Sequence, residues 1–427
     1  MSRTNRPSRP ATVWPWLLPL MAASSLAAQT PTVSPALTLK TAFEAAWQLQ
    51  PEAQALQVRR DAATARRALA EHWTSDTPAL TLAHKTDQLG SRAGLREIEI
   101  GISAPLWLPD ERTRSGALAD AEIAALDARK QAAQLHIAAA TREAYWAWQR
   151  ARVEHTLARE RLANAQRLAT DVSRRVHAGD LAQVDQHQAD VAVATAELVQ
   201  IESTEALSKS ALHLSALSGL PLAARTSDTS SDLTPPSEPI PEPIADVVTL
   251  NRHPALSETR AQHVLARRAA ELAQVQTRAK PELVLTAAQG RESSFYPYQQ
   301  SVTLGLRLPL GDETRHRAKV ADTEANAIET GHRLAQELIR LNAELTAAQQ
   351  RVESAQTRLT SADQRARLAR EWLGFVDKSF RLGESDLPTR LRVEQDSVEA
   401  SRQASLLRIE LAAAISQLRQ ISGLLPE

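Results

Sequence analysis

The chain has 427 residues, and its 50 lysines and arginines are balanced by 50 aspartates and glutamates. This neutrality leaves no basic footprint for nucleic acid, so we expect no nucleic-acid partner. Cysteine is absent, which excludes disulfides, thiol catalysis and lipid attachment through an N-terminal cysteine. Glycine and aromatic residues are scarce, while alanine, leucine, glutamine, arginine and glutamate dominate, which is typical of long helices.

The first 28 residues have the order of a secretory signal peptide. Three arginines precede an apolar run over residues 13–26, and small residues follow. We expect cleavage after Ala27 or Ala28. No later segment approaches about 18 to 20 uninterrupted apolar residues, so no transmembrane helix is expected. This pattern leaves open a soluble periplasmic protein as the alternative.

Helix and strand patterns follow in order. Residues 38–49 predict a helix that restarts at Pro51, because proline is tolerated in a first helical turn. A strand is expected to open at Pro78, and residues 97–105, EIEIGISAP, alternate strictly between apolar and polar or small residues. A period of two predicts a strand.

The next predicted element is very long. Residues 110–176 contain no proline, and at 1.5 Å per residue such a helix would span roughly 100 Å. It ends at Gly179, a suitable left-handed cap, and Asp180 begins a return helix of roughly 38 residues. Residues 227–244, rich in proline and serine, predict a linker that cannot be helical.

The second half repeats the first at a nearly constant shift. Residues 301–309, SVTLGLRLP, repeat the strand pattern 204 residues later, and Gly383 lies 204 residues after Gly179. Apolar residues from Leu334 to Phe380 alternate spacings of four and three, which predicts a coiled-coil seam. We therefore expect a tandem duplication. The predicted parts are a signal peptide over 1–28, a first repeat over 29–226, a linker over 227–244 and a second repeat over 245–427.

Alternating strands in a helical protein point to a membrane. Four strands cannot close a barrel, open sheet edges are not tolerated in lipid, and bacterial barrels need about eight strands, so several chains must contribute. Glu97, Glu99 and Arg307 would then face a lumen, with aromatic residues at the strand ends. The alternative is a soluble sheet packed on the helices. The expected lipid-facing residues are Ile98, Ile100, Ile102, Val302, Leu304 and Leu306.

In these features the sequence resembles the TolC-like outer membrane factor family over essentially all of the chain after residue 28. The matching features are the Thr38–Ala42 opening, prolines 51 and 254, strands ending in Pro105-Leu106 and Pro309-Leu310, glycines 179 and 383, and the Ser-Gly-Leu that closes each half. The resemblance implies a mainly α fold with a small β part. Duplicated coiled-coil hairpins and four strands per chain would form, as a homotrimer, a transmembrane β-barrel of about 12 strands and a periplasmic α-helical tunnel.

The same resemblance implies a function. It suggests an exit duct in the outer membrane of a Gram-negative bacterium, which passively conducts substrates from a periplasmic adaptor (a membrane fusion protein) and an inner-membrane pump. Its partners would be two further copies, the adaptor and pump, and outer membrane lipid. Within the family, the resemblance suggests the heavy-metal or cation efflux branch.

The working end of such a duct would be the pair of glycine turns. The resemblance implies that they meet the adaptor and open or close, whereas the alternative is that their glycines and acidic residues only cap helices. The residues expected there are Val176, His177, Gly179, Asp180, Arg381, Gly383, Glu384 and Leu387.

Four residues are candidates to line the pore: Asp185, Asp386, Thr389 and Arg392. Well-known family members carry aspartates after the second-half glycine. Thr389 and Arg392 occupy the corresponding positions here, so a cation-binding ring of aspartates is in doubt.

Enzymatic chemistry has no sequence support. The histidines are not paired at metal-ligand spacings, and no catalytic triad, phosphate-binding loop or carboxylate pair is present, so we expect no metal, cofactor or catalytic residue. The competing functions are the outer membrane component of type I protein secretion and a periplasmic coiled-coil adaptor or scaffold. An adaptor would carry one hairpin, whereas this sequence predicts two.

Overall fold

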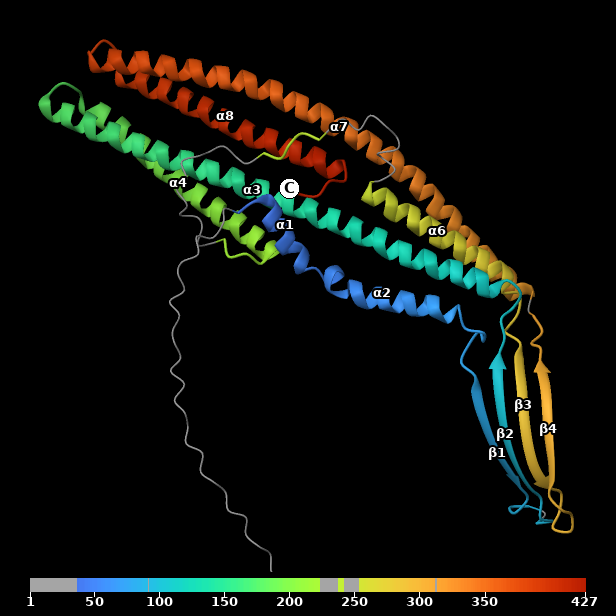
Figure 1. Ribbon diagram of the computed structural model, residues 1–427. Coiled ribbons are helices and arrows are strands. Elements are labelled where there is room, and N and C mark those ends of the chain that lie inside the picture. Colours follow the sequence, from blue (N-terminus) through green and yellow to red (C-terminus); the bar gives the residue numbers. More distant parts are fainter. Residues whose placement is uncertain (1–36, 91, 223–236, 242–252, 312) are drawn as a thin grey trace, which may run out of the picture. The chain divides into compact units, whose positions relative to one another are not determined.

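Long helices and one small sheet make up the described part of the chain, which in this computed structural model covers residues 37–90, 92–222, 237–241, 253–311 and 313–427 (Figure 1). Residues Thr38–Glu427 pack together as one unit. The predicted signal peptide and most of the predicted linker lie outside the described residues. In chain order the elements are α1 (Leu39–Gln48), α2 (Pro51–Leu69), β1 (Ala79–Thr86), β2 (Arg96–Pro105), α3 (Glu111–Ala178), α4 (Gln183–Ser218), α6 (Pro254–Val275), β3 (Glu282–Arg291), β4 (Gln299–Arg307), α7 (Glu313–Arg381) and α8 (Leu387–Ile421).

Both long helices are confirmed, with 68 residues in α3 and 69 in α7. The kink at Pro51 is confirmed as well, because α1 ends at Gln48 and Pro51 is the first residue of α2. Helix α6 of the second half has 22 residues and begins at Pro254. Residues 242–252 lie outside the described part.

The helices pack in a fixed lateral order. Helix α3 packs against α2 and α6 along one part of its length and against α4 and α8 along the rest, while α7 packs against α6 and α8. One flank of the subunit is therefore made by α2 and α4, and the opposite flank by α7. Each return helix ends against the opening helix of its own half: a Cβ added at Gly219 would lie 2.9 Å from Leu49, and one at Gly423 would lie 2.7 Å from Pro254.

The predicted seam of α7 is buried against α8 from Leu341 onward. One part of it packs Leu345, Ala348 and Val352 against α8, and the next part uses small side chains, including Ala362 and Ala366. Alanines let two helix backbones approach closely, which explains the many alanines in the stripe. In the described residues, no helix is both long and apolar enough to cross a membrane.

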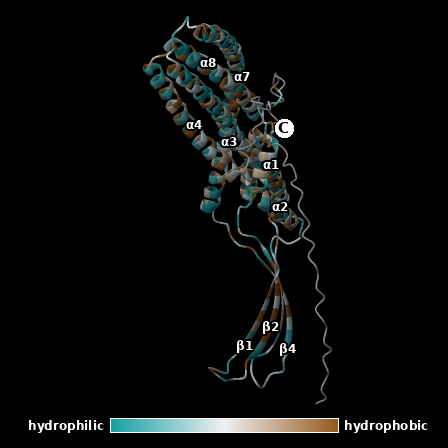
Figure 2. Cartoon of the chain, turned by 90° about the vertical axis from the view of Figure 1, so that its left-hand side faces the viewer, coloured by the Kyte–Doolittle hydropathy of each residue, from teal (hydrophilic) through white to brown (hydrophobic). Residues whose placement is uncertain are grey.

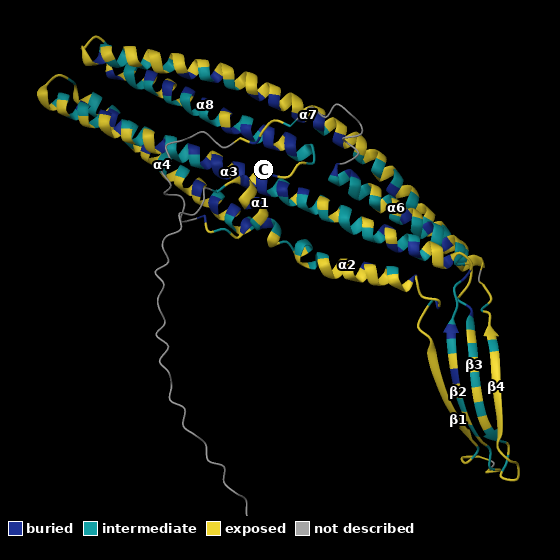
Figure 3. Ribbon diagram, viewed as in Figure 1, coloured by how far each residue is buried: buried dark blue, intermediate teal, exposed yellow. Residues whose placement is uncertain are grey.

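The sheet is antiparallel throughout, in the order β1-β2-β3-β4. Strands β2 and β3, which are far apart in the sequence, pair at its centre, and β1 and β4 form its edges. Both edge strands are exposed along nearly their whole length (Figure 3). The sheet thus ends on each side in a row of backbone groups without a partner strand in the described subunit.

A short network joins the sheet to the helices. The backbone N–H of Leu106 donates to Pro281 O at 2.7 Å, and Trp107 Nε1 donates to His72 O at 3.0 Å. Lys280 Nζ donates to Ser75 O at 2.7 Å and lies 5.5 Å from the centre of the Trp107 ring. The chain segments that enter and leave the strands are therefore fixed to one another at this end of the sheet.

A buried ionic cluster fixes the linker midway along the helices. Glu238 lies between Arg142 of α3 and Arg419 of α8, with nitrogen–oxygen distances of 3.1 and 3.3 Å, and all three residues are buried. The Ser416 hydroxyl also donates to Glu238, and Arg419 donates to Pro239 O at 3.1 Å. Burial lowers the pKa of the Arg142 guanidinium, and its hydrogen bond to Glu238 opposes this. The Glu238 carboxylate thus faces two buried cations, and Arg419 also pairs with Glu427 at 2.9 Å.

Replacing Glu238 with alanine removes this carboxylate and leaves both arginines buried. We expect a loss of about 3 to 5 kcal/mol in the free energy of unfolding, because an unpaired buried charge is costly. Asp127→Ala is the control, since Asp127 and Arg60 form a half-exposed pair at 3.5 Å, and it should cost less than about 1 kcal/mol. Thermal unfolding followed by circular dichroism measures both. Equal effects would contradict a structural role for the cluster.

His253 predicts a pH dependence of stability. Its Nδ1 accepts a hydrogen bond from the Ala255 N–H at 3.2 Å, so it must be unprotonated to cap α6. Burial lowers its pKa below the ordinary 6.5; a backbone hydrogen bond to Ile421 opposes this, and Glu337, Arg340 and Glu344 contribute smaller effects. The native state therefore binds fewer protons than the unfolded chain. Stability should be full above about pH 6.5 and fall as the pH decreases below it.

The matched variant is His253→Asn, because asparagine caps helices and does not titrate. Melting temperatures at pH 7.5 and pH 5.5 should differ more for the wild type than for this variant. An unchanged difference would assign the pH dependence to other groups.

Candidate functional site

The two glycine turns have the same backbone geometry. Gly179 has a φ of 84° and Gly383 a φ of 78°, values that favour glycine. In each turn the glycine N–H bonds the carbonyl three residues back, Val176 O or Phe380 O, and the next residue bonds a carbonyl five back at 2.9 Å. This is a Schellman-type helix end. The predicted glycine caps are confirmed at both ends.

Acidic residues cap the helices that leave these turns. Asp185 Oδ2 accepts the Ala182 N–H at 3.0 Å, and Asp386 Oδ1 accepts the Thr389 N–H at 3.2 Å. Hydrogen bonding to Thr389 lowers the pKa of the Asp386 carboxyl. Both aspartates therefore cap these helices, whereas lining of a pore by Asp185, Asp386 or Thr389 stays a prediction.

An apolar cluster joins the two turns. Leu168, Val172 and Ala189 of the first hairpin pack with Phe380 and Leu387 of the second. Leu387 was expected to contact a partner, but it is only 1% exposed. It therefore has no surface to offer in this arrangement and instead holds the hairpins together.

Cations surround the Phe380 ring, a feature that the sequence analysis missed. The guanidinium of Arg175 lies 5.1 Å from the ring centre and that of Arg390 lies 5.7 Å away. Arg390 also pairs with Asp377 at 3.0 Å and Glu394 at 3.1 Å, while Asp377 binds Arg381 at 2.6 Å. Of these pairs, only those at helical spacing, such as Arg390 with Glu394, left a signal in the sequence.

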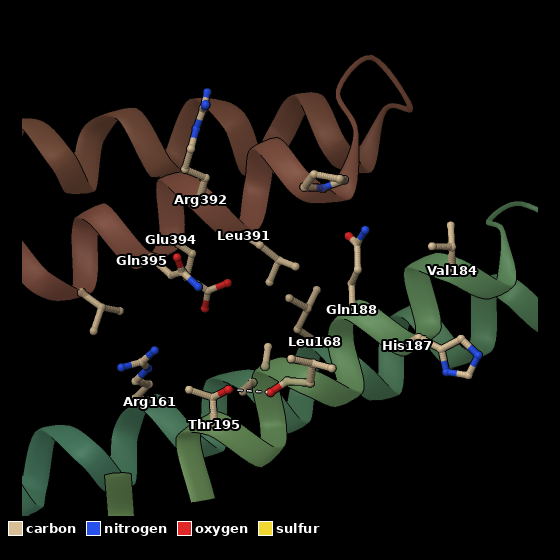
Figure 4. A pocket seen from close by; sticks show the side chains of 15 residues that line it. Arg161, Leu168, Val184, His187, Gln188, Thr195, Leu391, Arg392, Glu394 and Gln395 are labelled. Atoms are coloured by element: carbon tan, nitrogen blue, oxygen red, sulfur yellow. Dashed lines mark hydrogen bonds between the residues drawn. The ribbon is translucent and has the colours of Figure 1, made fainter. Parts of the chain in front are cut away.

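A groove opens between the hairpins near the turns (Figure 4). It has a volume of about 510 Å³ and is lined by α3, α4 and α8. Arg392, a predicted pore residue, contributes to this lining together with Arg161, His187 and Leu391. Within one subunit Arg392 is therefore part of an inter-hairpin groove.

The second candidate site is the apolar face of the sheet. The strand register pairs Leu82 with Ile100, Ile100 with Ala287, and Ala287 with Val302, so one face is apolar across all four strands. Figure 2 shows hydrophobic residues along the strands. The six residues predicted to face lipid share this face and are 49% to 75% exposed. The opposite face carries Glu97 and Arg307, which form loose pairs with Lys85 and Glu282 at 3.7 Å.

The described residues contain no group of three or more histidine, aspartate or glutamate side chains that could hold a metal ion.

Solved structures with the same fold include outer membrane proteins. The chain is similar to CusC, a structure described for its transmembrane channel formation, with a TM-score of 0.72 and 15% identity over 91% of this chain and 92% of that one. The outer membrane protein VceC from Vibrio cholerae has a TM-score of 0.70 and 18% identity over 90% of this chain and 96% of that one. The CmeC outer membrane channel of Campylobacter jejuni has a TM-score of 0.71 and 12% identity over 90% of this chain and 85% of that one. At such identities the likeness defines the fold, that of an outer membrane channel subunit.

The sequence itself matches the outer membrane efflux protein family over residues 43–220. The predicted family, fold class and efflux function are thereby confirmed. No curated protein sequence matches the chain.

The glycine turns give a prediction at each tip. Alanine at Gly179 or Gly383 must adopt a left-handed backbone, so each change should destabilise its turn by about 1 to 2 kcal/mol. Nothing lies within 4 Å of the added Cβ, which makes the effect one of backbone conformation. Hydrogen exchange of the amides at the turn measures it.

Gly374 provides the control. It lies inside α7, and its added Cβ also meets nothing within 4 Å. Gly374→Ala should stabilise the helix by about 0.5 to 1 kcal/mol. Faster exchange in this variant, as in the two turn variants, would mean that added volume rather than backbone strain is responsible.

Proposed function

We propose that three copies of this chain form an exit duct in the outer membrane that conducts substrates delivered by a periplasmic adaptor and an inner-membrane pump. The observation that carries the proposal is a sheet with one continuous apolar face and two free edges. In lipid an unpaired strand edge is costly, so the edges of such a sheet must meet other strands. Three four-stranded sheets are enough to close a barrel.

The two edges belong to opposite halves of the chain, and this fixes how copies meet. The β1 edge of one subunit would pair with the β4 edge of the next, so each contact joins two different surfaces. Contacts of this kind close into a ring when the rotation allows it. The polar sheet face, with Glu97, Glu99 and Arg307, would then line the lumen.

The helices offer matching flanks. On α4, Leu198, Ile201 and Leu212 are 61% to 63% exposed and do not line the groove between the hairpins. On the part of α7 beside α8, Leu368, Trp372 and Phe375 form an exposed stripe. We name the contact between these two stripes the subunit seam. Burying it between copies would continue the ring of the barrel into a helical tunnel.

The tips would meet the adaptor. Val176, His177, Gly179, Asp180, Arg381, Gly383 and Glu384 lie at or beside the two turns and remain the proposed contact residues. The pairing of Asp377 with Arg381 and Arg390 favours a tip whose charges are organised within the subunit. Export of heavy-metal cations is the substrate class that the sequence resemblance favours. Type I secretion would use the same architecture, and a substrate assay separates the two.

Lysine at Ile100 or Leu304 tests the membrane-facing strands. A charge on the lipid face should cost about 2 to 4 kcal/mol per site and block assembly in the outer membrane. Thr303→Lys is the control, because Thr303 lies beside Leu304 on the opposite face. Outer membrane fractions probed by immunoblot give the yield. Normal yield after both apolar changes would exclude a lipid-facing role.

The subunit seam gives a second test. Replacing both Trp372 and Phe375 with glutamate removes two large apolar side chains, each worth about 1.5 to 3 kcal/mol when buried. Native mass spectrometry of protein extracted from outer membranes in detergent should show trimers for the wild type and mostly monomers for this variant. Leu382→Glu changes an exposed leucine at the turn and should leave the trimer intact. A wild-type monomer or dimer found in the periplasm would exclude the duct.

A further inference from the structure

Two arginines lie directly opposite each other at the turn end of the apolar face. The strand register pairs Arg96 of β2 with Arg291 of β3. Arg96 is two residues from Ile98, and Arg291 is two residues from Gln289, the partner of Ile98, so both belong to the lipid-facing side of the sheet. This is the end of the sheet farthest along the strands from the helices.

Like charges placed directly opposite each other destabilise a strand pair. No carboxylate of the described residues forms an ion pair with either arginine. Arg291 Nε is buried and has no hydrogen-bond partner in the described part of the chain. A pair of cations with an unused buried donor is a site that lacks its anion.

The surroundings select the kind of anion. The Arg291 guanidinium lies 5.1 Å from the centre of the Tyr298 ring, which orients it. Tyr298, Tyr296 and Phe295 are 49%, 61% and 92% exposed on the same turn. The Ser294 N–H donates to Ala93 O at 3.0 Å, so this turn is held against the loop between β1 and β2.

We propose that Arg96 and Arg291 bind the phosphate of a membrane lipid headgroup at the outer rim of the barrel, an inference that rests on the proposed function. Guanidinium groups bind phosphate oxygens with paired hydrogen bonds. The apolar face that begins at Ile98 receives the acyl chains of the same molecule, and the exposed aromatic residues lie at the level of the headgroups. A free phosphate would use the two arginines alone, whereas a lipid uses the whole continuous surface.

The test measures lipid binding to the assembled protein by native mass spectrometry. Dioleoylphosphatidylglycerol should bind the wild type more tightly than dioleoylphosphatidylcholine. The double variant Arg96→Gln/Arg291→Gln should weaken phosphatidylglycerol binding at least about tenfold, because it removes charge-assisted hydrogen bonds. Arg96 is exposed, so Arg96→Gln alone should assemble normally. This single variant should also weaken phosphatidylglycerol binding, and it replaces the double variant if that one does not assemble.

Lys85→Gln is the matched control. Lys85 lies at the same end of the sheet but on the opposite face, where it pairs with Glu97. An equal loss in this variant would mean that overall charge, not the site, attracts the lipid, and would overturn the proposal. Displacement of the lipid by inorganic phosphate at equal concentration would overturn it as well.

The outcomes separate this site from the proposed function. Wild-type protein that inserts into phosphatidylglycerol vesicles as a trimer but shows no preference between the two lipids overturns the lipid site alone. Failure of the wild type to insert into these vesicles overturns the membrane-spanning duct and the lipid site together.

Discussion

The free edges of the four-stranded sheet constrain the rest of the structure. A backbone N–H or C=O in lipid must be hydrogen-bonded, and β1 and β4 each present a row of such groups without a partner strand in the described subunit. The apolar face across the sheet makes lipid the environment that suits it. A subunit with this sheet is incomplete alone. Its helices are likewise open on two flanks, one made by α2 and α4 and the other by α7.

The helical part solves a different physical problem. Helices of 68 and 69 residues cannot rely on a globular core, so each is held along its length by a partner with small side chains. Where α3 changes partners from α6 to α8, the structure places buried charge beside the apolar cluster that contains Leu345, Ile415 and Leu418. Glu238 joins α3, α8 and the linker at this point, and only a fully paired cluster is tolerated there.

Periodicity explains what the sequence predicted. The period of two in residues 97–105 and the spacings of four and three from Leu334 to Phe380 are local patterns, and both survive in the structure because one face of each element is specialised. Contacts between distant elements leave no such pattern. The pairing of Arg142 with Glu238, of Arg96 with Arg291, and of Arg175 with Phe380 depends on register and packing across about 100 residues or more. Leu387 was misassigned because its cap position predicts a turn but not which way the side chain points.

The two unlike flanks of the subunit have a consequence for genetics. A subunit with a damaged α7 flank still carries an intact α4 flank. In the proposed ring it would bind one neighbour through α4 but could not bind the other, so the ring would stay open. When equal amounts of normal and damaged subunits mix at random, only about one in eight of the three-subunit rings consists of normal copies alone. Such variants should act in a dominant way over a normal copy of the gene, whereas loss of the whole protein should be recessive.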